Sequence, residues 1–202
     1  MESLPVVYVT DGTDAISETY LSIVNVLVNL IADGRIEPVI AVFIDPHNAA
    51  TGEYVRDVEL APVNMETCPF FDFVTEELVP LIDANYMSDL STDARAVFGT
   101  SLGGQWAAYM GLAHNDLFHL IGMQSFPAPD GHWILQGYWQ AGELPISLFL
   151  HHGTYDTGTA PLPADVLREK VVPLNYIETH GRHAHGSWRA TTDDMLVTFF
   201  GI

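Results

Sequence analysis

The segment Gly99-Thr100-Ser101-Leu102-Gly103 has the spacing G-x-S-x-G, the motif with the clearest chemistry in the sequence. In this spacing a serine sits on a tight strand-to-helix turn, and glycines two residues away on each side relieve the strained backbone. The turn would lift the Ser101 hydroxyl above a sheet and place the Leu102 N–H beside a developing oxyanion. A strand pattern precedes the motif and a helix pattern follows it. We therefore predict Ser101 as a nucleophile for an ester carbonyl, against the alternative of a glycine-rich turn with an inert serine.

A serine nucleophile needs a base, and the base needs an acid that orients it. The order along the chain in proteins with this turn is serine, acid, histidine. His183 lies in a glycine-flanked loop after the last expected strand and is the predicted base, with His180 and His185 as competitors. Asp156 follows an expected strand and is the predicted acid, although such turns favour Asp in any case.

The remaining candidates would surround the reacting carbonyl. A second oxyanion donor is expected from the N–H of Gly12 or Thr13, after the first strand, where glycine lets the backbone approach a substrate. Arg56 could clamp a substrate carboxylate or phenolate, or it could pair with Asp57 or Glu59.

Three tryptophans are candidates for binding the acyl or aryl group of a substrate. Trp133 and Trp139 lie in an aromatic segment, 126–142, that we expect to be a loop above the pocket. Trp188 stands five residues after His183. For Trp133 and Trp139 the alternative is packing onto the core, and for Trp188 it is packing against the terminal helix.

Two further groups of residues could in principle do chemistry. His180, His183 and His185, with His151 and His152, raise the question of zinc. However, the first three share one glycine-rich loop without a cysteine, so we predict no metal site. Cys68 is the only cysteine and is expected to be a semi-buried residue near a helix start rather than a catalytic thiol.

Apolar strand patterns alternate with amphipathic helix patterns along the chain. Such strands argue for a parallel sheet covered on both faces, a three-layer α/β sandwich. Expected strands cover 5–10, 38–45, 94–100, 120–125, 146–153 and 172–179. Expected helices cover 16–32, a segment from Pro69 to Ile82, 102–114, 164–170 and 192–200, and 53–66 is expected to be a loop.

Length and composition limit the partners and the setting. With 202 residues and 48% hydrophobic content, the chain suits one domain, 1–202. No segment is predicted to span a membrane or to be a signal peptide, and the single cysteine fits a reducing, cytoplasmic setting. The net charge of −19 repels nucleic acid and anionic membranes, which we exclude as main partners. A surface that is acidic and poor in lysine also favours a halophilic source.

Several segments resemble a known family. Residues 99–104 (GTSLGG), 8–12 (YVTDG) and 56–60 (RDVEL) are similar to a group of α/β-hydrolase esterases that includes the enterochelin esterases and the esterase D (S-formylglutathione hydrolase) type. Residues 181–189 (GRHAHGSWR) resemble the Gly-Gly-His-Asp-x-x-x-Trp-Arg stretch of enterochelin-esterase-like proteins. The resemblance implies His183 as base and, through a Gly-Thr-x-Asp match, Asp156 as acid. A Ser–His pair without an acid is also implied for some members.

The chain departs from this family in three places. Arg182 replaces a glycine, Ala184 replaces an aspartate, and the chain begins at what would be the third of eight strands. The sheet edge is therefore expected to be shortened or covered by a partner, and a homo-oligomer stays open.

The sequence predicts a serine carboxylic-ester hydrolase that needs no cofactor and forms an acyl-enzyme with small or aryl esters. Hydrolysis of catecholate siderophores is an alternative, which the high negative charge disfavours. Acyl transfer to another acceptor, or an inactive binding domain on the same fold, would also fit the sequence.

Overall fold

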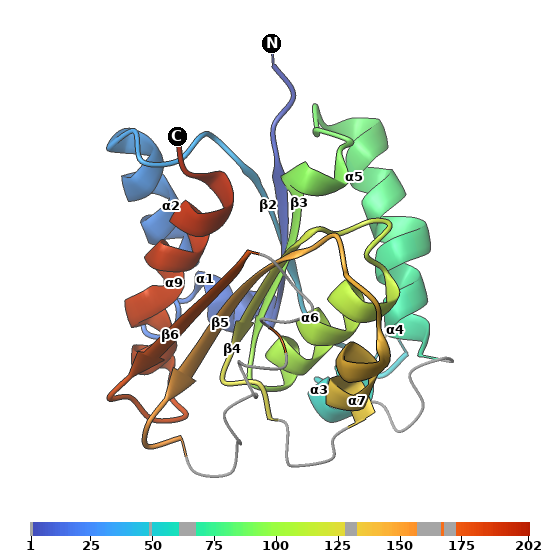
Figure 1. Cartoon of the computed structure of the whole chain (residues 1–202). Coiled ribbons are helices and arrows are strands. Elements are labelled where there is room, and N and C mark those ends of the chain that lie inside the picture. Colours follow the sequence, from blue (N-terminus) through green and yellow to red (C-terminus); the bar gives the residue numbers. More distant parts are fainter. Residues whose placement is uncertain (1, 49, 61–67, 128–132, 157–166, 168–172) are drawn as a thin grey trace.

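The computed structural model describes residues 2–48, 50–60, 68–127, 133–156, 167 and 173–202. Its centre is one six-stranded parallel sheet in the order β2-β1-β3-β4-β5-β6 (Figure 1). The strands are β1 (Val6–Thr10), β2 (Ile40–Ile44), β3 (Arg95–Thr100), β4 (Leu120–Gln124), β5 (Ser147–Gly153) and β6 (Leu174–Thr179). All five strand pairs are parallel, which confirms the predicted sheet.

Helices cover both faces of the sheet, so the predicted three-layer sandwich is confirmed (Figure 1). One face carries α1 (Gly12–Ile16), α2 (Ile23–Ala32) and α9 (His185–Phe200). The other carries α4 (Pro69–Asp72), α5 (Val79–Asn85), α6 (Leu102–Ala113) and α7 (Trp133–Gln140). A π-helical stretch (Phe73–Leu78) joins α4 to α5 next to Pro80, which has no N–H to donate. The described residues also form two short helical turns, α3 (Arg56–Glu59) and η3 (Thr92–Ala94).

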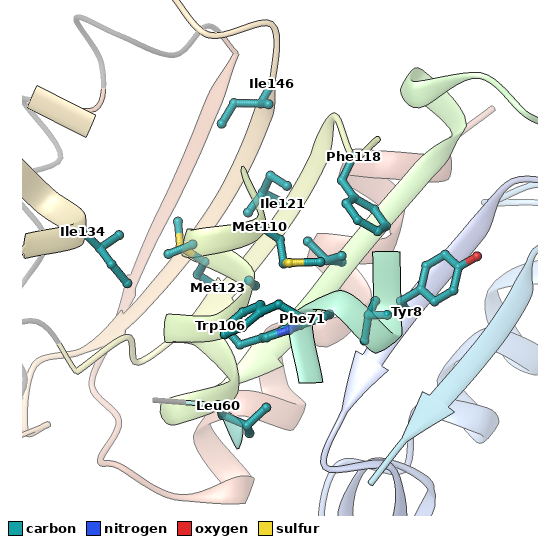
Figure 2. Close-up of a cluster of buried hydrophobic side chains, with 14 of the residues drawn as sticks. Tyr8, Leu60, Phe71, Trp106, Met110, Phe118, Ile121, Met123, Ile134 and Ile146 are labelled. Atoms are coloured by element: carbon teal, nitrogen blue, oxygen red, sulfur yellow. The ribbon is translucent and has the colours of Figure 1, made fainter. Parts of the chain in front are cut away.

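The larger hydrophobic core lies between the sheet and the α4–α7 side. Trp106 of α6 is completely buried there, beside Phe71 and Met110 (Figure 2). A second core lies under α1, α2 and α9, on the opposite face of the sheet. It includes Phe98 of β3 and Phe149 of β5. Strands with apolar residues on both faces suit a sheet that is buried on both sides.

The order of the strands determines where a site can form. β1 and β3 are neighbours in the sheet. From β1 the chain continues to β2 on one side, and from β3 it continues to β4 on the other side, so it leaves β1 and β3 in opposite directions. Open parallel sheets bind ligands at such a switch point, beyond the carboxyl ends of the strands. Gly12 follows β1 and Ser101 follows β3, so both predicted contributors to the site lie at this switch point.

Several predicted elements are wrong in extent. The expected helix 16–32 begins only at Ile23, because Ser22 has a left-handed backbone (φ 55°) that interrupts the helical path. The expected loop 126–142 contains α7, whose Tyr138 is buried and donates a hydrogen bond to the Ala108 carbonyl. The expected loop 53–66 contains α3, and its last part, 61–66, lies outside the described residues.

The last helix, predicted over 192–200, starts seven residues earlier, at His185. Its first turn therefore follows His183 almost directly. The expected helix 164–170 lies outside the described residues, apart from Leu167. Across the described part of the chain, none of the helices combines the length and the apolar character needed to cross a membrane.

Candidate active site

Ser101 occupies a strained turn between β3 and α6. Its backbone angles, φ 56° and ψ −120°, are rarely adopted by residues other than glycine. The Ser101 N–H donates to the Gln124 carbonyl at 2.8 Å, which ties the turn to β4. A Cβ on Gly99 would lie 2.2 Å from the Gly103 carbonyl atoms, so only glycine fits there. The turn thus depends on the residue types that the motif predicts.

His183 lies between Ser101 and Asp156. Its Nε2 is 2.8 Å from Ser101 Oγ, and its Nδ1 is 2.9 Å from Asp156 Oδ1. Because an ionised carboxylate only accepts hydrogen bonds, Nδ1–H would donate to Asp156 and Nε2 would accept from the serine hydroxyl. The Asp156 side chain is completely buried, whereas His183 is 37% exposed. This arrangement can remove a proton from Ser101 and stabilise the resulting imidazolium.

The loops that carry the acid and the histidine are bound to each other by their backbones. Thr154 N–H donates to the Thr179 carbonyl at 2.8 Å, and Tyr155 N–H donates to the Gly181 carbonyl at 2.9 Å. Gly153 allows this approach, since a Cβ there would lie 2.6 Å from the Gly181 oxygen. The distance between acid and base is therefore fixed by backbone contacts across the ends of β5 and β6.

Trp188 forms a wall beside the histidine. Its ring meets the His183 ring edge-on, with centroids 5.0 Å apart and an interplanar angle of 86°. The indole N–H donates to Ser125 Oγ at 2.8 Å, and the Trp188 carbonyl accepts from Gln124 Nε2 at 2.9 Å. Gln124 and Ser125 are fully buried. The residues at the end of β4 thus hold both the nucleophile turn and the wall behind the histidine.

The pocket at Ser101 has a volume of about 410 Å³. Of the predicted substrate-binding residues, Arg56 and Trp188 line it. Trp133 instead contacts Tyr109, and Trp139 lies 67% exposed at a separate hollow on α7. Leu21, which the sequence did not single out, supplies apolar surface. The described residues around the pocket are Asp11, Asp14, Leu21, Arg56, Thr100, Ser101, His183, Ala184, His185 and Trp188.

The segment expected to supply a second oxyanion donor follows β1. Thr13 already donates twice to the Asp45 carboxylate, from its N–H at 2.8 Å and from Oγ1 at 2.6 Å. Gly12 begins α1, and a Cβ there would lie 3.0 Å from backbone atoms of Phe43 and Ile44. Glycine therefore lets this segment lie directly against β2.

Arg56 pairs with Asp11 rather than with Asp57 or Glu59, the acidic residues nearest to it in the sequence. Its Nε donates to Asp11 Oδ1 at 2.7 Å, and its Nη2 donates to Asp11 Oδ2 at 2.8 Å. Nη2 also donates to the Thr100 carbonyl at 2.9 Å. The partner is 45 positions away in the sequence, and only the fold brings it to Arg56.

Three other histidines that were considered as zinc ligands each contact a different partner. His185 lies 3.8 Å from Asp14, His180 Nδ1 lies 3.4 Å from Thr154 Oγ1, and His151 Nε2 lies 2.9 Å from Thr179 Oγ1. Burial, helped by the neighbouring His152, lowers the pKa of His151 to about 4. Within the described ranges, no three His, Cys, Asp or Glu side chains gather as metal ligands would.

Cys68 is buried at the start of α4, and burial raises the pKa of its thiol. The reactive form of a cysteine is the thiolate, which a raised pKa disfavours. This environment is typical of a structural cysteine.

The two departures in the His183 segment fall at positions that tolerate them. Arg182 is exposed, so its side chain needs no room in the core. Ala184 occupies the N-cap position of α9, and its side chain makes no capping hydrogen bond. An aspartate there could cap the helix, a contribution of about 1 kcal/mol that this chain lacks.

The sheet order, the turn at Ser101 and the flanking helices define an α/β-hydrolase-type fold. The sequence matches the family described as "Putative esterase" over residues 1–189, and the chain belongs to that family.

Solved structures with this fold include a ferulic acid esterase (TM-score 0.79, 18% identity, covering 98% of this chain and 86% of that one). The enterobactin esterase FES from Shigella flexneri, determined in the presence of enterobactin, is also similar (TM-score 0.81, 22% identity, 98% of this chain). This chain spans only 52% of that enzyme. An S-formylglutathione hydrolase from Agrobacterium tumefaciens has a TM-score of 0.71 at 16% identity, covering 99% and 86% of the two chains.

Proposed function

We propose that this protein is a serine carboxylic-ester hydrolase that works through an acyl-enzyme. The observation that carries the proposal is the hydrogen-bonded series Ser101–His183–Asp156, with both links below 3 Å, beside a pocket. Membership of the esterase family supports ester hydrolysis as the class of reaction.

The reaction would proceed in two halves. Ser101 Oγ bonds to the ester carbonyl carbon while its proton moves to His183 Nε2. The C–O bond to the leaving group then breaks, and the departing alcohol takes that proton. Water next attacks the acyl-serine, giving one proton to His183, and the carboxylic acid leaves as Ser101 regains its hydrogen.

The oxyanion of each tetrahedral intermediate would accept hydrogen bonds from the N–H groups of Leu102 and Gly12. Leu102 N–H lies at the start of α6, directly after Ser101. We choose Gly12 over Thr13 because Thr13 would first have to give up its bond to Asp45. No cofactor enters these steps.

The pocket favours small or aryl esters without negative charge. Leu21 and Trp188 offer apolar contacts, and a volume of about 410 Å³ fits a small acyl or aryl group. Asp14 also lines the pocket, where Arg56 balances the charge of Asp11, and the net charge of −19 would repel anionic catecholate siderophores.

Ester turnover by purified protein tests this proposal. We expect hydrolysis of p-nitrophenyl acetate and methyl ferulate, slower turnover of a linear 2,3-dihydroxybenzoyl-serine ester, and loss of all three activities in Ser101→Ala. Wild-type protein without turnover would favour an inactive binding domain. A product found only with an added alcohol acceptor would instead indicate acyl transfer. Full activity in Ser101→Ala would refute the assignment of the nucleophile.

A further inference from the structure

Arg56 connects the ends of two neighbouring strands at the candidate site. Its guanidinium donates to both carboxylate oxygens of Asp11 and to the carbonyl of Thr100, all within 2.9 Å. Asp11 immediately precedes Gly12, and Thr100 immediately precedes Ser101 and Leu102. One side chain therefore contacts both backbone segments from which the proposed oxyanion donors extend.

Both segments have unusual backbones at this point. Asp11 is left-handed, with φ 54° and ψ 48°, and Ser101 also has a positive φ of 56°. Such conformations are unfavourable for residues with a Cβ and persist only when their surroundings hold them. The Asp11 carboxylate is almost fully buried and accepts a further hydrogen bond from the Tyr54 hydroxyl.

The two segments also touch. A Cβ on Gly103, in the first turn of α6, would lie 2.4 Å from Thr10 Oγ1 and 3.2 Å from Asp11 Oδ2. A shift of Asp11 would therefore be transmitted to the start of α6, where Leu102 N–H lies. Oxyanion donors act because they are fixed at hydrogen-bonding distance before the reaction.

We propose that Arg56 is a positioning residue that sets the separation of the two oxyanion donors, Gly12 N–H and Leu102 N–H, by binding Asp11 and Thr100 at once. This inference rests on the proposed esterase function. It differs from a substrate-anion clamp, because Asp11 neutralises the guanidinium and because Nε and Nη2 are both occupied by protein acceptors.

The test compares Arg56→Lys with wild type on a neutral ester, p-nitrophenyl acetate, and an anionic one, mono-p-nitrophenyl succinate. Lysine keeps a cation beside Asp11 but lacks the planar fork that reaches two acceptors. We expect kcat to fall about 10- to 100-fold on both esters. This loss is smaller than the roughly 100- to 1,000-fold loss of kcat that follows removal of an oxyanion donor. KM should stay within about twofold and the pH at which kcat rises should be unchanged, because neither substrate capture nor His183 is altered.

Asp11→Asn is the second variant and should reproduce the loss of kcat without removing Arg56. Arg35→Lys is the matched control, because Arg35 is an exposed arginine in a 3.8 Å surface pair with Asp193. Thermal unfolding of each variant identifies those that are folded.

The inference is overturned if either folded Arg56→Lys or Asp11→Asn keeps wild-type kcat, or if Arg56→Lys raises KM for the anionic ester alone. Failure of the proposed function looks different: wild-type protein would then hydrolyse neither ester.

Discussion

The nucleophile turn and the acid–base loops are built in different ways. The shape of the turn is largely local, because Gly99, Ser101 and Gly103 lie within five residues and the two glycines meet sterically, while the Ser101 N–H bond to Gln124 links the turn to β4. The acid–base side, formed by Asp156, His183 and their loops, joins two residues that are 27 positions apart, and His183 contacts Ser101 across 82 positions. Backbone hydrogen bonds, glycine contacts and the Trp188 wall hold it in place. A short motif can therefore specify the first region, whereas the second depends on the whole sheet.

The largest expected effect comes from breaking the turn itself. Gly99→Ala would place a methyl group 2.2 Å from the Gly103 backbone, and such overpacking against main chain should cost about 3 kcal/mol or more in stability. We expect ester turnover to be lost and the thermal unfolding midpoint to fall sharply. Gly142→Ala is the control, because nothing lies within 4 Å of that position. Equal behaviour of the two variants would mean that sterics do not define the turn.

On the acid–base side, Asp156→Asn should lower kcat about 10³- to 10⁴-fold, because an amide no longer fixes the proton on His183 Nδ1. The unfolding midpoint should change much less than in Gly99→Ala, since the loop backbone bonds remain. Steady-state kinetics measures the effect, with the half-exposed Asp193→Asn as the matched control. Near-normal kcat in Asp156→Asn would instead support a Ser–His pair without an acid.

A smaller effect is expected from the wall behind the histidine. Trp188→Phe keeps a ring near His183 but loses the hydrogen bond to Ser125 Oγ. We expect kcat to fall about tenfold and stability to fall by about 1–3 kcal/mol, because the buried Ser125 hydroxyl loses its donor. Trp139→Phe, on an exposed site, is the control. If both variants match wild type in kinetics and in urea unfolding, Trp188 has no role in holding the base.

A further effect, on stability alone, concerns pH. In the folded protein the pKa of His151 is about 4, so the side chain is neutral above that pH. In the unfolded chain a histidine has a pKa near 6.5. Protons therefore favour unfolding as the pH falls from about 6.5 toward 4, and stability is lost in that window. Between pH 7.5 and pH 5 this group should cost about 2 kcal/mol.

Urea unfolding of wild type and His151→Gln at the two pH values measures this effect, because contributions from groups that do not interact with His151 cancel in the difference. The variant should lose about 2 kcal/mol less than wild type on acidification. An equal loss in both proteins would show that His151 does not make the acid–base side sensitive to pH.

The difference between local and long-range contacts also explains what the sequence could predict. The parallel sheet, its six strands and the turn at Ser101 follow from local patterns. Chain order and family resemblance predict Asp156 and His183, and the structure places His183 between Asp156 and Ser101, although their roles stay predictions. The pairing of Arg56 with Asp11 could not be foreseen, because neither residue's neighbours in the sequence reveal it.

Helix boundaries differ from expectation where tertiary contacts decide them. The early start of α9 depends on Trp188 packing against buried Ser125 and Gln124, and no local pattern encodes that contact. The expectation that Trp133 and Trp139 lie at the pocket depended on a loop over 126–142. In α7, which packs against α6, Trp133 contacts Tyr109 and Trp139 is exposed.

Covalent labelling tests the central claim, that Ser101 is activated by His183, most directly. Intact-protein mass spectrometry after treatment with a fluorophosphonate should show one phosphonyl group added to wild type. We expect no addition in Ser101→Ala and strongly slowed addition in His183→Ala, with both variants folded. Unlabelled wild type, or labelling of Ser101→Ala at the wild-type rate, would contradict this claim.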